Sequence, residues 1–327
     1  MYVVTGAAGF IGSNIVAALA ERGQDVVVCD WFHQDERWRN LGKHELAEIV
    51  APEDLLDWLR RNHTSIEVVV HMGAISATTE TNVDLIVANN VRTTLGLLQW
   101  CAETKTRFLF ASSAATYGDG ANGFDDTLDC ASLAALRPLN AYGWSKHVVD
   151  RRIARLVERS QPLPPQWAGL KFFNVYGPNE YHKGSMQSAI AKNYALVRGA
   201  QPLRLFRSHR PDYADGCQLR DFVYVQDCVD VILWLVDHPQ VSGLFNLGTG
   251  RARTWLDLAE AMFKAVGVPR TIEFIDMPLA LVAKYQYFTE ARMARLRAAG
   301  YDRPFTSLEE GVGNYVRNYL GTDDPYR

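Results

Sequence analysis

The sequence predicts an α/β protein built on a doubly wound parallel sheet, with a second, smaller α/β unit after it. Three observations support this fold class. A glycine-bearing turn joins an apolar strand to an amphipathic helix near the N-terminus. Short apolar runs then alternate with helical patterns as far as about Asn174, as in a parallel sheet with crossover helices. After Pro178 this rhythm stops, so we expect a change of architecture there.

The composition indicates an ordinary globular chain. Of the 327 residues, 48% are hydrophobic and 22% are charged, which leaves no difficulty in burying a core. The formal net charge is -3, and Lys and Arg form no blocks, so neither nucleic acid nor a membrane surface is expected as a partner. No basic segment followed by an apolar stretch begins the chain, and no apolar run approaches membrane-spanning length. We therefore expect a cytoplasmic protein.

The cysteines are odd in number, widely spaced and without metal-type pairing, so no metal site is expected. They are predicted to be reduced thiols of the core: Cys29, Cys101, Cys130, Cys217 and Cys228.

Residues 2–28 are predicted to form a strand, a glycine turn, a helix and a second strand. Gly6, Gly9 and Gly12 fall in the turn and in the first helical residues. Because these residues lack side chains, a pyrophosphate can approach the backbone while the helix N-terminus offers unpaired N–H groups. The spacing is G-x-x-G-x-x-G rather than the commoner G-x-G-x-x-G. Its place between a strand and a helix nevertheless indicates a dinucleotide site of the Rossmann type.

An acidic residue, Asp30, closes the second strand. A carboxylate there can bond an adenosine ribose hydroxyl, which by itself favours NAD. Arg37 and Arg39 follow in the next loop and could either neutralise the 2′-phosphate of NADP or remain solvated. These residues leave the choice between NAD and NADP open.

A third strand is expected at residues 66–71, after a short helix at 53–61. It ends in Met72 and Ala74, and small residues at a strand end let the cofactor pass over the sheet edge. His71 is predicted to be a satisfied core histidine rather than a catalyst.

A long helix is expected over residues 82–104. Asn89 and Asn90 interrupt its apolar pattern. One of them could face a cofactor or orient the backbone, and the alternative is a surface position.

The first candidate catalytic group follows the strand at residues 107–111. Ser113 lies at the carboxyl end of this strand, where open α/β sheets bind ligands. A helix is then expected to carry Tyr142 and Lys146, which lie on one face because they are four residues apart. A cation beside a phenol stabilises phenolate, so we expect Lys146 to lower the pKa of Tyr142 from its ordinary value of about 10. Tyr142 would then serve as an acid/base.

Six segments together resemble the extended short-chain dehydrogenase/reductases that act on nucleotide sugars: TGAAGFIG, SSAATYG, YGWSK, FFNVYGP, RDFVYVQD and FNLGTG. In that family the Tyr and Lys of Y-x-x-x-K and an earlier Ser or Thr carry the chemistry, which implies Tyr142, Lys146 and Ser113 here. Lys146 would also bond the nicotinamide ribose. The cofactor contacts expected in all are Gly6, Gly9, Phe10, Ile11, Gly12, Asp30, Trp31, Arg37, Met72, Ala74, Ser76, Asn89, Lys146, Val175 and Lys183.

Longer segments are similar to one branch of this family, the ADP-glyceromanno-heptose 6-epimerases: NVYGPNEYHKGSM, FNLGTGRARTW and KYQYFTEARMARLRAAGYDRPF. In that branch the Lys of H-K-G-S-M is the proposed second acid/base, which implies Lys183. The resemblance also implies substrate contacts, some of them from basic groups that suit a diphosphate. These are Ser113, Asn174, Ser185, Lys192, Phe206, Arg207, Ser208, His209, Arg220 and Tyr285. Residues 210–219 look like an extended loop relative to shorter members of the branch.

The branch implies inversion at C6 of the heptose in ADP-D-glycero-D-manno-heptose, to the L-glycero form, for bacterial lipopolysaccharide. A carbinol carbon can be inverted by removing hydride to a nicotinamide and returning it to the other face of the ketone. The ketone oxygen then meets a different proton donor, so Tyr142 and Lys183 would serve the two orientations. The resemblance further implies tightly bound NADP, with NAD possible, and a homo-oligomer that is a pentamer in this branch.

Other functions are less well supported. Family dehydratases usually carry Asp and Glu where Ala114 and Ala115 stand, so elimination is disfavoured and a UDP-sugar 4-epimerase is the alternative enzyme. A non-catalytic dinucleotide-sensing regulator would not need Ser113, Tyr142 and Lys146 together.

We place the dinucleotide-binding domain at residues 1–173 plus 221–246 and the substrate-binding domain at 174–220 plus 247–327. A helix at 227–236 and a strand at 243–246 are expected to return the chain to the first domain.

Two helix starts are predicted in the second half. Thr254 is expected to cap a helix with Asp257 at its third position, and Ser307 with Glu310 forms a capping-box pattern for the last helix.

Overall fold

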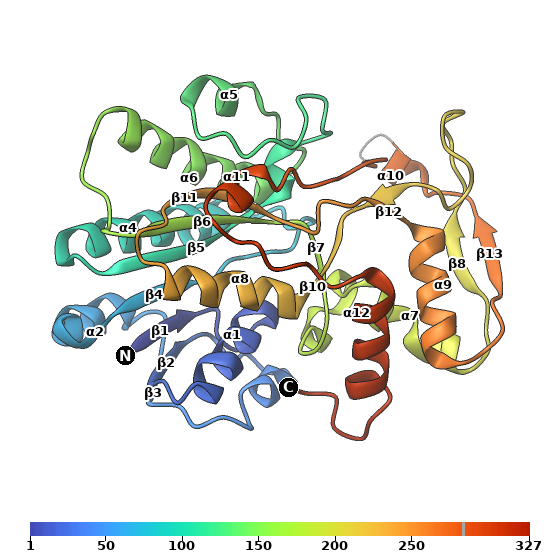
Figure 1. Cartoon of the computed structure of the whole chain (residues 1–327), viewed down its shortest axis with the longest axis horizontal. Coiled ribbons are helices and arrows are strands. Elements are labelled where there is room, and N and C mark those ends of the chain that lie inside the picture. Colours follow the sequence, from blue (N-terminus) through green and yellow to red (C-terminus); the bar gives the residue numbers. More distant parts are fainter. Residues whose placement is uncertain (283–284) are drawn as a thin grey trace.

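The computed structural model describes residues 1–282 and 285–327, and these contain a seven-stranded parallel sheet (Figure 1). The strand order is β11-β6-β5-β4-β1-β2-β3, so the chain winds outward from β1 first to one edge and then to the other. This confirms the doubly wound sheet. Its strands are β1 (Tyr2–Thr5), β2 (Val26–Cys29), β3 (Glu48–Val50), β4 (Val68–His71), β5 (Arg107–Ser113), β6 (Trp167–Phe172) and β11 (Gly243–Leu247).

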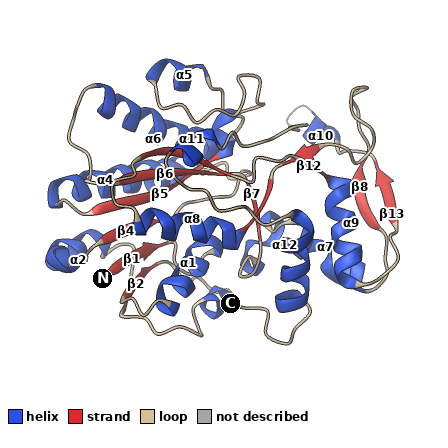
Figure 2. Ribbon diagram, in the orientation of Figure 1, coloured by secondary structure: helices blue, strands red, loops and turns tan. Residues whose placement is uncertain are grey.

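Helices cover both faces of the sheet (Figure 2). Val4 and the residues paired with it in β2 and β4 pack against α1 (Phe10–Glu21) and α8 (Val225–Asp237). Val3 and the residues paired with it in the same two strands pack against the opposite layer. That layer contains α2 (Leu55–Asn62), α4 (Thr93–Thr104) and α6 (Ala141–Glu158). A strand buried on both sides must be apolar at successive positions. The continuous valine runs of β1, β2 and β4 therefore reflect this sandwich.

The predicted helix over residues 82–104 forms, but its centre is not α-helical. α3 (Val83–Ile86) continues into a π-helical stretch, Val87–Arg92, and then into α4. Asn90 lies in this stretch and is buried, so a surface position for it is wrong. Its side-chain amide binds both backbone groups of Ile75 and donates to Ser145 Oγ at 3.0 Å. Asn90 thus ties the segment after β4 to α6.

A second group of elements lies beside one end of the sheet, at the right of Figure 1. Its core joins α7 (Ala189–Arg198), α9 (Trp255–Val266) and α12 (Leu308–Tyr315) to the strand pair β8 (Leu203–Phe206) and β13 (Ile272–Ile275). The predicted second, smaller α/β unit is therefore present. Two further pairs are β7 (Asn174–Tyr176) with β10 (Phe222–Tyr224) and β9 (Leu219–Arg220) with β12 (Arg253–Thr254). Short helices complete the described chain: α5 (Cys130–Ala135), α10 (Leu279–Val282), α11 (Ala294–Ala298), and the 3-10 or π turns η1 (Glu36–Asn40), η2 (His63–Ser65), η4 (Ala114–Tyr117), η5 (Tyr181–Met186) and η6 (Val316–Leu320).

The chain leaves the central sheet at Asn174. Phe173 N still donates to Leu247 O in β11 at 3.0 Å, but Asn174 N donates to Asp221 O at 3.1 Å. Strand β6 therefore ends before Asn174, and a separate short strand, β7, begins at that residue. The assignment of whole segments to two domains stays a prediction.

The predicted caps form as expected. Thr254 with Asp257 and Ser307 with Glu310 each make a reciprocal capping box, at the starts of α9 and α12. Each satisfies two backbone groups that the first helical turn would leave unpaired.

All five cysteines are free thiols. Cys29, Cys101 and Cys228 are buried as predicted, whereas Cys130 and Cys217 are only half-buried, so these two are not core residues. Within residues 1–282 and 285–327, no helix combines the length and the apolar character needed to cross a membrane.

Candidate active site

A cleft of about 1200 Å³ opens at the carboxyl ends of the sheet strands. Its walls come from the ends of β1, β2, β4, β5 and β6, from α6 and from the segment after β7. All the cofactor-binding residues predicted from the sequence line it: Gly6, Gly9, Phe10, Ile11, Gly12, Asp30, Trp31, Arg37, Met72, Ala74, Ser76, Asn89, Lys146, Val175 and Lys183.

The glycine turn leaves no room for side chains. A Cβ on Gly12 would lie 2.1 Å from Gly6 O, and one on Gly6, whose φ is +63°, would lie 2.6 Å from Gly73 N. Helix α1 begins directly after this turn, and no side chain caps its N-terminus. Its first N–H groups and the positive end of its dipole are therefore available to an anion, as a dinucleotide pyrophosphate requires. The residues present fit a nicotinamide dinucleotide.

Asp30 holds the glycine turn as well as lining the cleft. Its Oδ2 accepts from Ala8 N and its Oδ1 from Trp31 N, each at 2.8 Å. Burial raises the pKa of Asp30, and these backbone donors oppose the rise. Each carboxylate oxygen keeps a further acceptor site, so a ribose hydroxyl can still bind there.

Arg37 and Arg39 differ in position. Arg37 lines the cleft and makes a two-pronged contact with Asp35, from Nε at 2.8 Å and Nη2 at 2.7 Å. This hydrogen-bonded pair lowers the pKa of Asp35 to about 2. Arg39 is exposed and pairs with Glu36. Of the two arginines, Arg37 is thus the one that lines the cleft.

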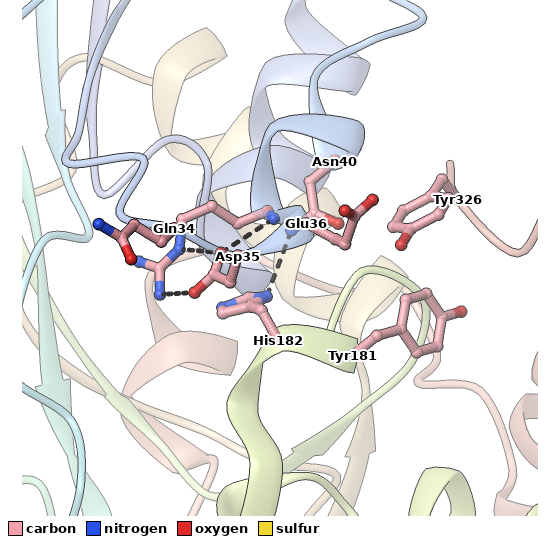
Figure 3. A pocket seen from close by; sticks show the side chains of 8 residues that line it. Gln34, Asp35, Glu36, Asn40, Tyr181, His182 and Tyr326 are labelled. Carbon is pink, nitrogen blue, oxygen red and sulfur yellow. Dashed lines mark hydrogen bonds and ion pairs between the residues drawn. The ribbon is translucent and has the colours of Figure 1, made fainter.

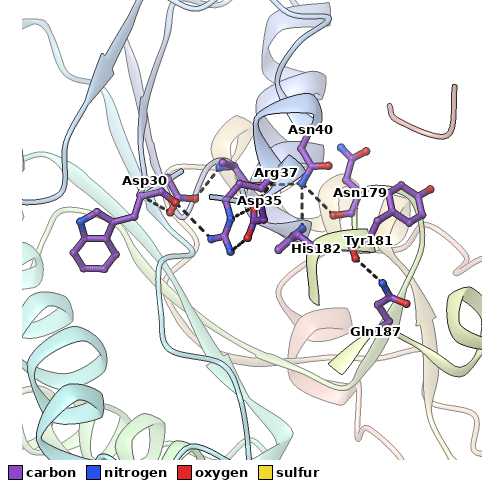
Figure 4. A network of polar contacts seen from close by, with 10 residues as sticks. Asp30, Asp35, Arg37, Asn40, Asn179, Tyr181, His182 and Gln187 are labelled. Atoms are coloured by element: carbon purple, nitrogen blue, oxygen red, sulfur yellow. Dashed lines mark hydrogen bonds and ion pairs between the residues drawn. The ribbon is translucent and has the colours of Figure 1, made fainter. Parts of the chain in front are cut away.

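A smaller cavity of about 360 Å³ adjoins the cleft (Figure 3). Its lining residues are Gln34, Asp35, Glu36, Arg37, Asn40, Tyr181, His182 and Tyr326. The buried Asn40 amide donates to Ala8 O at 2.8 Å and to Asn179 O at 3.2 Å, with His182 Nδ1 at 3.4 Å. Figure 4 shows how these contacts connect the Asp30 and Arg37 region to the segment around His182. The glycine turn and the segment that carries Lys183 are therefore joined.

Ser113, Tyr142 and Lys146 all line the cleft. Lys146 Nζ donates to Ala111 O at 2.8 Å, and burial lowers the pKa of Lys146 to about 8 although Asp150 raises it. Burial also raises the pKa of Tyr142, and the nearby Ser113 hydroxyl opposes this. The expectation that Lys146 lowers the pKa of Tyr142 is wrong for this structure. The buried ammonium is directed to a backbone carbonyl, and desolvation of the phenol is the larger effect.

Lys183 reaches the same cleft from η5. Its ammonium lies 5.2 Å from the ring centre of Phe10, and burial lowers the pKa of Lys183, which Glu180 opposes. The buried Glu180 accepts hydrogen bonds from Gly177 N at 3.3 Å and from both the backbone and the hydroxyl of Ser188. Glu180 thereby fixes the segment on both sides of Lys183, a role that sequence reasoning missed.

The predicted substrate residues fall into two sets. Those that line the cleft are Ser113, Asn174, Lys192 and Phe206. Those that lie outside its lining are Ser185, Arg207, Ser208, His209, Arg220 and Tyr285.

Part of the outer set is connected to the cleft through aromatic contacts. The buried Arg220 guanidinium lies 5.0 Å from the ring centre of Tyr285. The Tyr285 ring is perpendicular to the Phe206 ring, with the two ring centres 6.3 Å apart. His209 is exposed, and its Nδ1 lies 2.9 Å from the hydroxyl of Tyr287. The exposed Arg207 is engaged by Asp276 at 3.2 Å.

Sequence reasoning missed several lining residues: His182, Asn193, Trp255, Gln286 and Thr289. Gln286 donates to Gly118 O and so bridges residues far apart in the chain. His182 was adjacent to a predicted residue, and Gln286 and Thr289 lie in the KYQYFTEARMARLRAAGYDRPF segment, whose resemblance to the branch was the signal that could have found them.

The comparisons with known proteins agree with this geometry. The model of the NAD dependent epimerase/dehydratase family matches residues 2–248. The chain is 50% identical to an ADP-L-glycero-D-manno-heptose-6-epimerase of Nitratidesulfovibrio vulgaris, over 100% of both chains. The solved structure of the Helicobacter pylori ADP-L-glycero-D-manno-heptose-6-epimerase is 26% identical, with a TM-score of 0.77 over 97% of this chain and 95% of that one. The Thermus thermophilus UDP-glucose 4-epimerase in complex with NAD is 25% identical, with a TM-score of 0.71 over 95% and 96%.

Proposed function

The chain belongs to the NAD dependent epimerase/dehydratase family, and on that premise we propose that it is an epimerase that inverts C6 of the heptose in ADP-D-glycero-D-manno-heptose. The observation that carries this proposal is the 50% identity over the full length of both chains with a heptose epimerase. The cleft adds a physical reason, because it contains two separate candidate acid/base groups, Tyr142 on α6 and Lys183 on η5. Two such groups would give the ketone oxygen a separate proton donor in each of its two orientations.

When bound in the cleft, a nicotinamide dinucleotide supplies a reversible hydride acceptor for C6. In our proposal Tyr142 exchanges the proton of the C6 hydroxyl in one orientation of the sugar, and Lys183 does so in the other. Burial lowers the pKa of Lys183 toward working pH, as a lysine that gives and takes protons requires. Ser113 would donate its hydroxyl hydrogen bond to the same oxygen, and Lys146 would hold the cofactor ribose.

We further propose that the cofactor is tightly bound NADP. Arg37 lines the cleft close to Asp30, so its guanidinium is available to the 2′-phosphate. Its existing pair with Asp35 would have to loosen or be shared. Identifying the nucleotide released when the purified protein is denatured tests this assignment, since release of NAD alone would contradict it.

The setting of the enzyme is proposed from its relatives. A heptose epimerase would supply the L-glycero sugar for lipopolysaccharide, would act in the cytoplasm and would form a homo-oligomer, with a pentamer as the expected size. Light scattering of the purified protein tests the last point directly.

The decisive experiment follows the configuration at C6. The purified protein is incubated with ADP-D-glycero-D-manno-heptose, and the ratio of the two epimers is measured by NMR. Equilibration of the two epimers is expected. Unchanged heptose together with conversion of UDP-galactose would replace the proposal by a UDP-sugar 4-epimerase, and conversion of neither sugar would favour a regulatory role.

A further inference from the structure

A buried ion pair lies behind the catalytic segments. Lys171 of β6 and Asp150 of α6 are fully buried, with Nζ and Oδ2 2.6 Å apart. A buried pair of this kind adds little net stability over apolar residues of the same size, because both charges lose their hydration. Stability alone is therefore a weak explanation of its presence. Its other contacts point to a more specific role.

Each member of the pair binds the segment that carries Ser113. Asp150 Oδ2 accepts from Ser112 Oγ at 2.9 Å. Lys171 Nζ donates to Thr116 Oγ1 at 2.7 Å, and the Thr116 hydroxyl donates to the backbone oxygen of Ser113 at 2.8 Å. Ser112 and Thr116 are almost fully buried, so water does not compete for these bonds. The segment is thus held on both sides of Ser113.

One member of the pair, Asp150, also belongs to the helix that carries Tyr142 and Lys146. Asp150 follows Lys146 by four residues on α6 and Tyr142 by eight, so all three lie close to one helical face. The Asp150 carboxylate raises the pKa of Lys146 against the effect of burial, which favours the charged ammonium. Helix and segment are in direct contact as well, since a Cβ on Gly143 would lie 2.6 Å from Ala115 O.

We propose that Asp150, Lys171 and Thr116 are positioning residues that fix the Ser113 hydroxyl relative to Tyr142 and Lys146. Lys171 anchors the segment to the sheet through Thr116, and Asp150 anchors it to the helix through Ser112. This inference rests on the proposed function, because it assigns a purpose to the same site. None of the three residues lines the cleft, so their effect reaches the substrate only through Ser113 and Lys146.

The most specific test removes one hydroxyl. Thr116→Val keeps the shape of the side chain and leaves the ion pair intact, but it cuts the link from Lys171 to Ser113. In the holoenzyme we expect kcat to fall roughly 10- to 100-fold with KM little changed, as for a misplaced catalytic group. Thr116→Ser restores the hydroxyl and should recover most of kcat. The matched control is Thr104→Val, which removes a threonine hydroxyl bonded to Trp100 O at the far end of α4.

Several outcomes would overturn the inference. A Thr116→Val enzyme with the kcat of wild type would do so, and so would equal losses in Thr116→Val and Thr116→Ser. A loss of kcat in Thr104→Val as large as in Thr116→Val would show a general effect of packing.

Two further measurements cover the remaining cases. If Thr116→Val does not fold, the double variant Asp150→Leu/Lys171→Met is used, because it removes both charges together. Its kcat should fall while cofactor binding persists. A wild-type kcat in this variant would refute the positioning role. Hydrogen exchange of residues 112–117 is independent of the substrate. Exchange should accelerate in Thr116→Val and not in Thr104→Val. Unchanged exchange in Thr116→Val would refute the positioning role. This result can be read even if the wild-type protein does not convert the heptose, so it distinguishes failure of the inference from failure of the proposed function.

Discussion

At the scale of single residues, Tyr142 is the group whose chemistry depends most on its surroundings. Burial raises the pKa of its phenol, so in this structure the neutral form dominates at working pH. A neutral phenol beside Ser113 can donate a proton to a ketone oxygen, and a charge nearby must develop before it can accept one. An oxidised nicotinamide dinucleotide bound in the cleft would supply such a charge.

The substitution Tyr142→Phe tests the proton transfer. It removes one hydroxyl and keeps the ring, so kcat should fall by about 10²- to 10⁴-fold, the usual contribution of a positioned acid/base. Cofactor affinity, measured by fluorescence titration, should stay close to that of wild type. Near-normal turnover would remove Tyr142 from the mechanism.

His71 shows how residue chemistry and stability are connected. The hydroxyl of Thr94 donates to Asn90 O, so it accepts from His71 Nε2 at 2.9 Å, and Nδ1 accepts from Thr5 Oγ1 at 2.6 Å. With Thr5 Oγ1 as the donor to Nδ1, the ring is neutral and carries its proton on Nε2. Burial lowers the pKa of His71 to about 3, which agrees with its prediction as a core histidine.

The consequence is an acid-sensitive fold. At pH values between the ordinary histidine pKa of about 6.5 and the lower pKa in the folded protein, His71 is protonated in the unfolded chain and neutral in the folded chain. The free energy of unfolding should therefore decrease as the pH falls below about 6.5, by at most about 1.4 kcal/mol per pH unit from this group. Urea unfolding at several pH values measures the slope. His71→Gln should reduce this slope, and an unchanged slope in that variant would contradict the assignment to His71.

At the scale of elements, two helices differ in whether a glycine can be replaced: the first turn of α1 leaves no room for a side chain, whereas the interior of α4 does. Gly12 lies where a Cβ would meet Gly6 O at 2.1 Å, whereas a Cβ on Gly96 would meet no described atom within 4 Å apart from its chain neighbours and the backbone of its own helix. Gly12→Ala should therefore displace α1 from the turn, lower the melting temperature and abolish cofactor binding. Gly96→Ala should stabilise the protein by about 0.5–1 kcal/mol, since alanine suits a helix interior better, and should leave turnover intact. Thermal unfolding and cofactor titration distinguish the two, and a functional Gly12→Ala would contradict the proposed pyrophosphate position.

Elements were predicted well where the signal is local. The strand, turn and helix of residues 2–28 and both capping boxes depend on residues within one or two turns of each other. The π-helical centre at Val87–Arg92 was not predicted, because the buried amide of Asn90 binds Ile75 and Ser145 from other parts of the chain. Only the packed structure brings these partners together.

At the scale of the whole molecule, the cleft collects residues from Thr5 to Thr289. A ligand that binds this cleft contacts only the folded chain and must stabilise it by mass action. NADP at about 100 times its dissociation constant should raise the free energy of unfolding by about 2.7 kcal/mol. Differential scanning fluorimetry measures the accompanying shift, and Gly12→Ala, which should not bind cofactor, is the matched control. In wild-type protein freed of bound nucleotide beforehand, a melting temperature that NADP leaves unchanged would argue against this cofactor.

Local patterns in the sequence were enough to predict the fold class, the glycine turn between β1 and α1, and many of the residues that line the cleft. These predictions follow from local periodicity, glycine spacing and motif resemblance, and each of these signals depends on residues that are close together in the sequence. The tertiary structure decided which distant groups meet: Asn40 with His182, and Lys171 with Asp150. It also decided the direction of the pKa of Tyr142, which sequence spacing predicted wrongly. Burial and hydrogen-bond partners are properties of the packed chain, because they are supplied by elements far away in sequence.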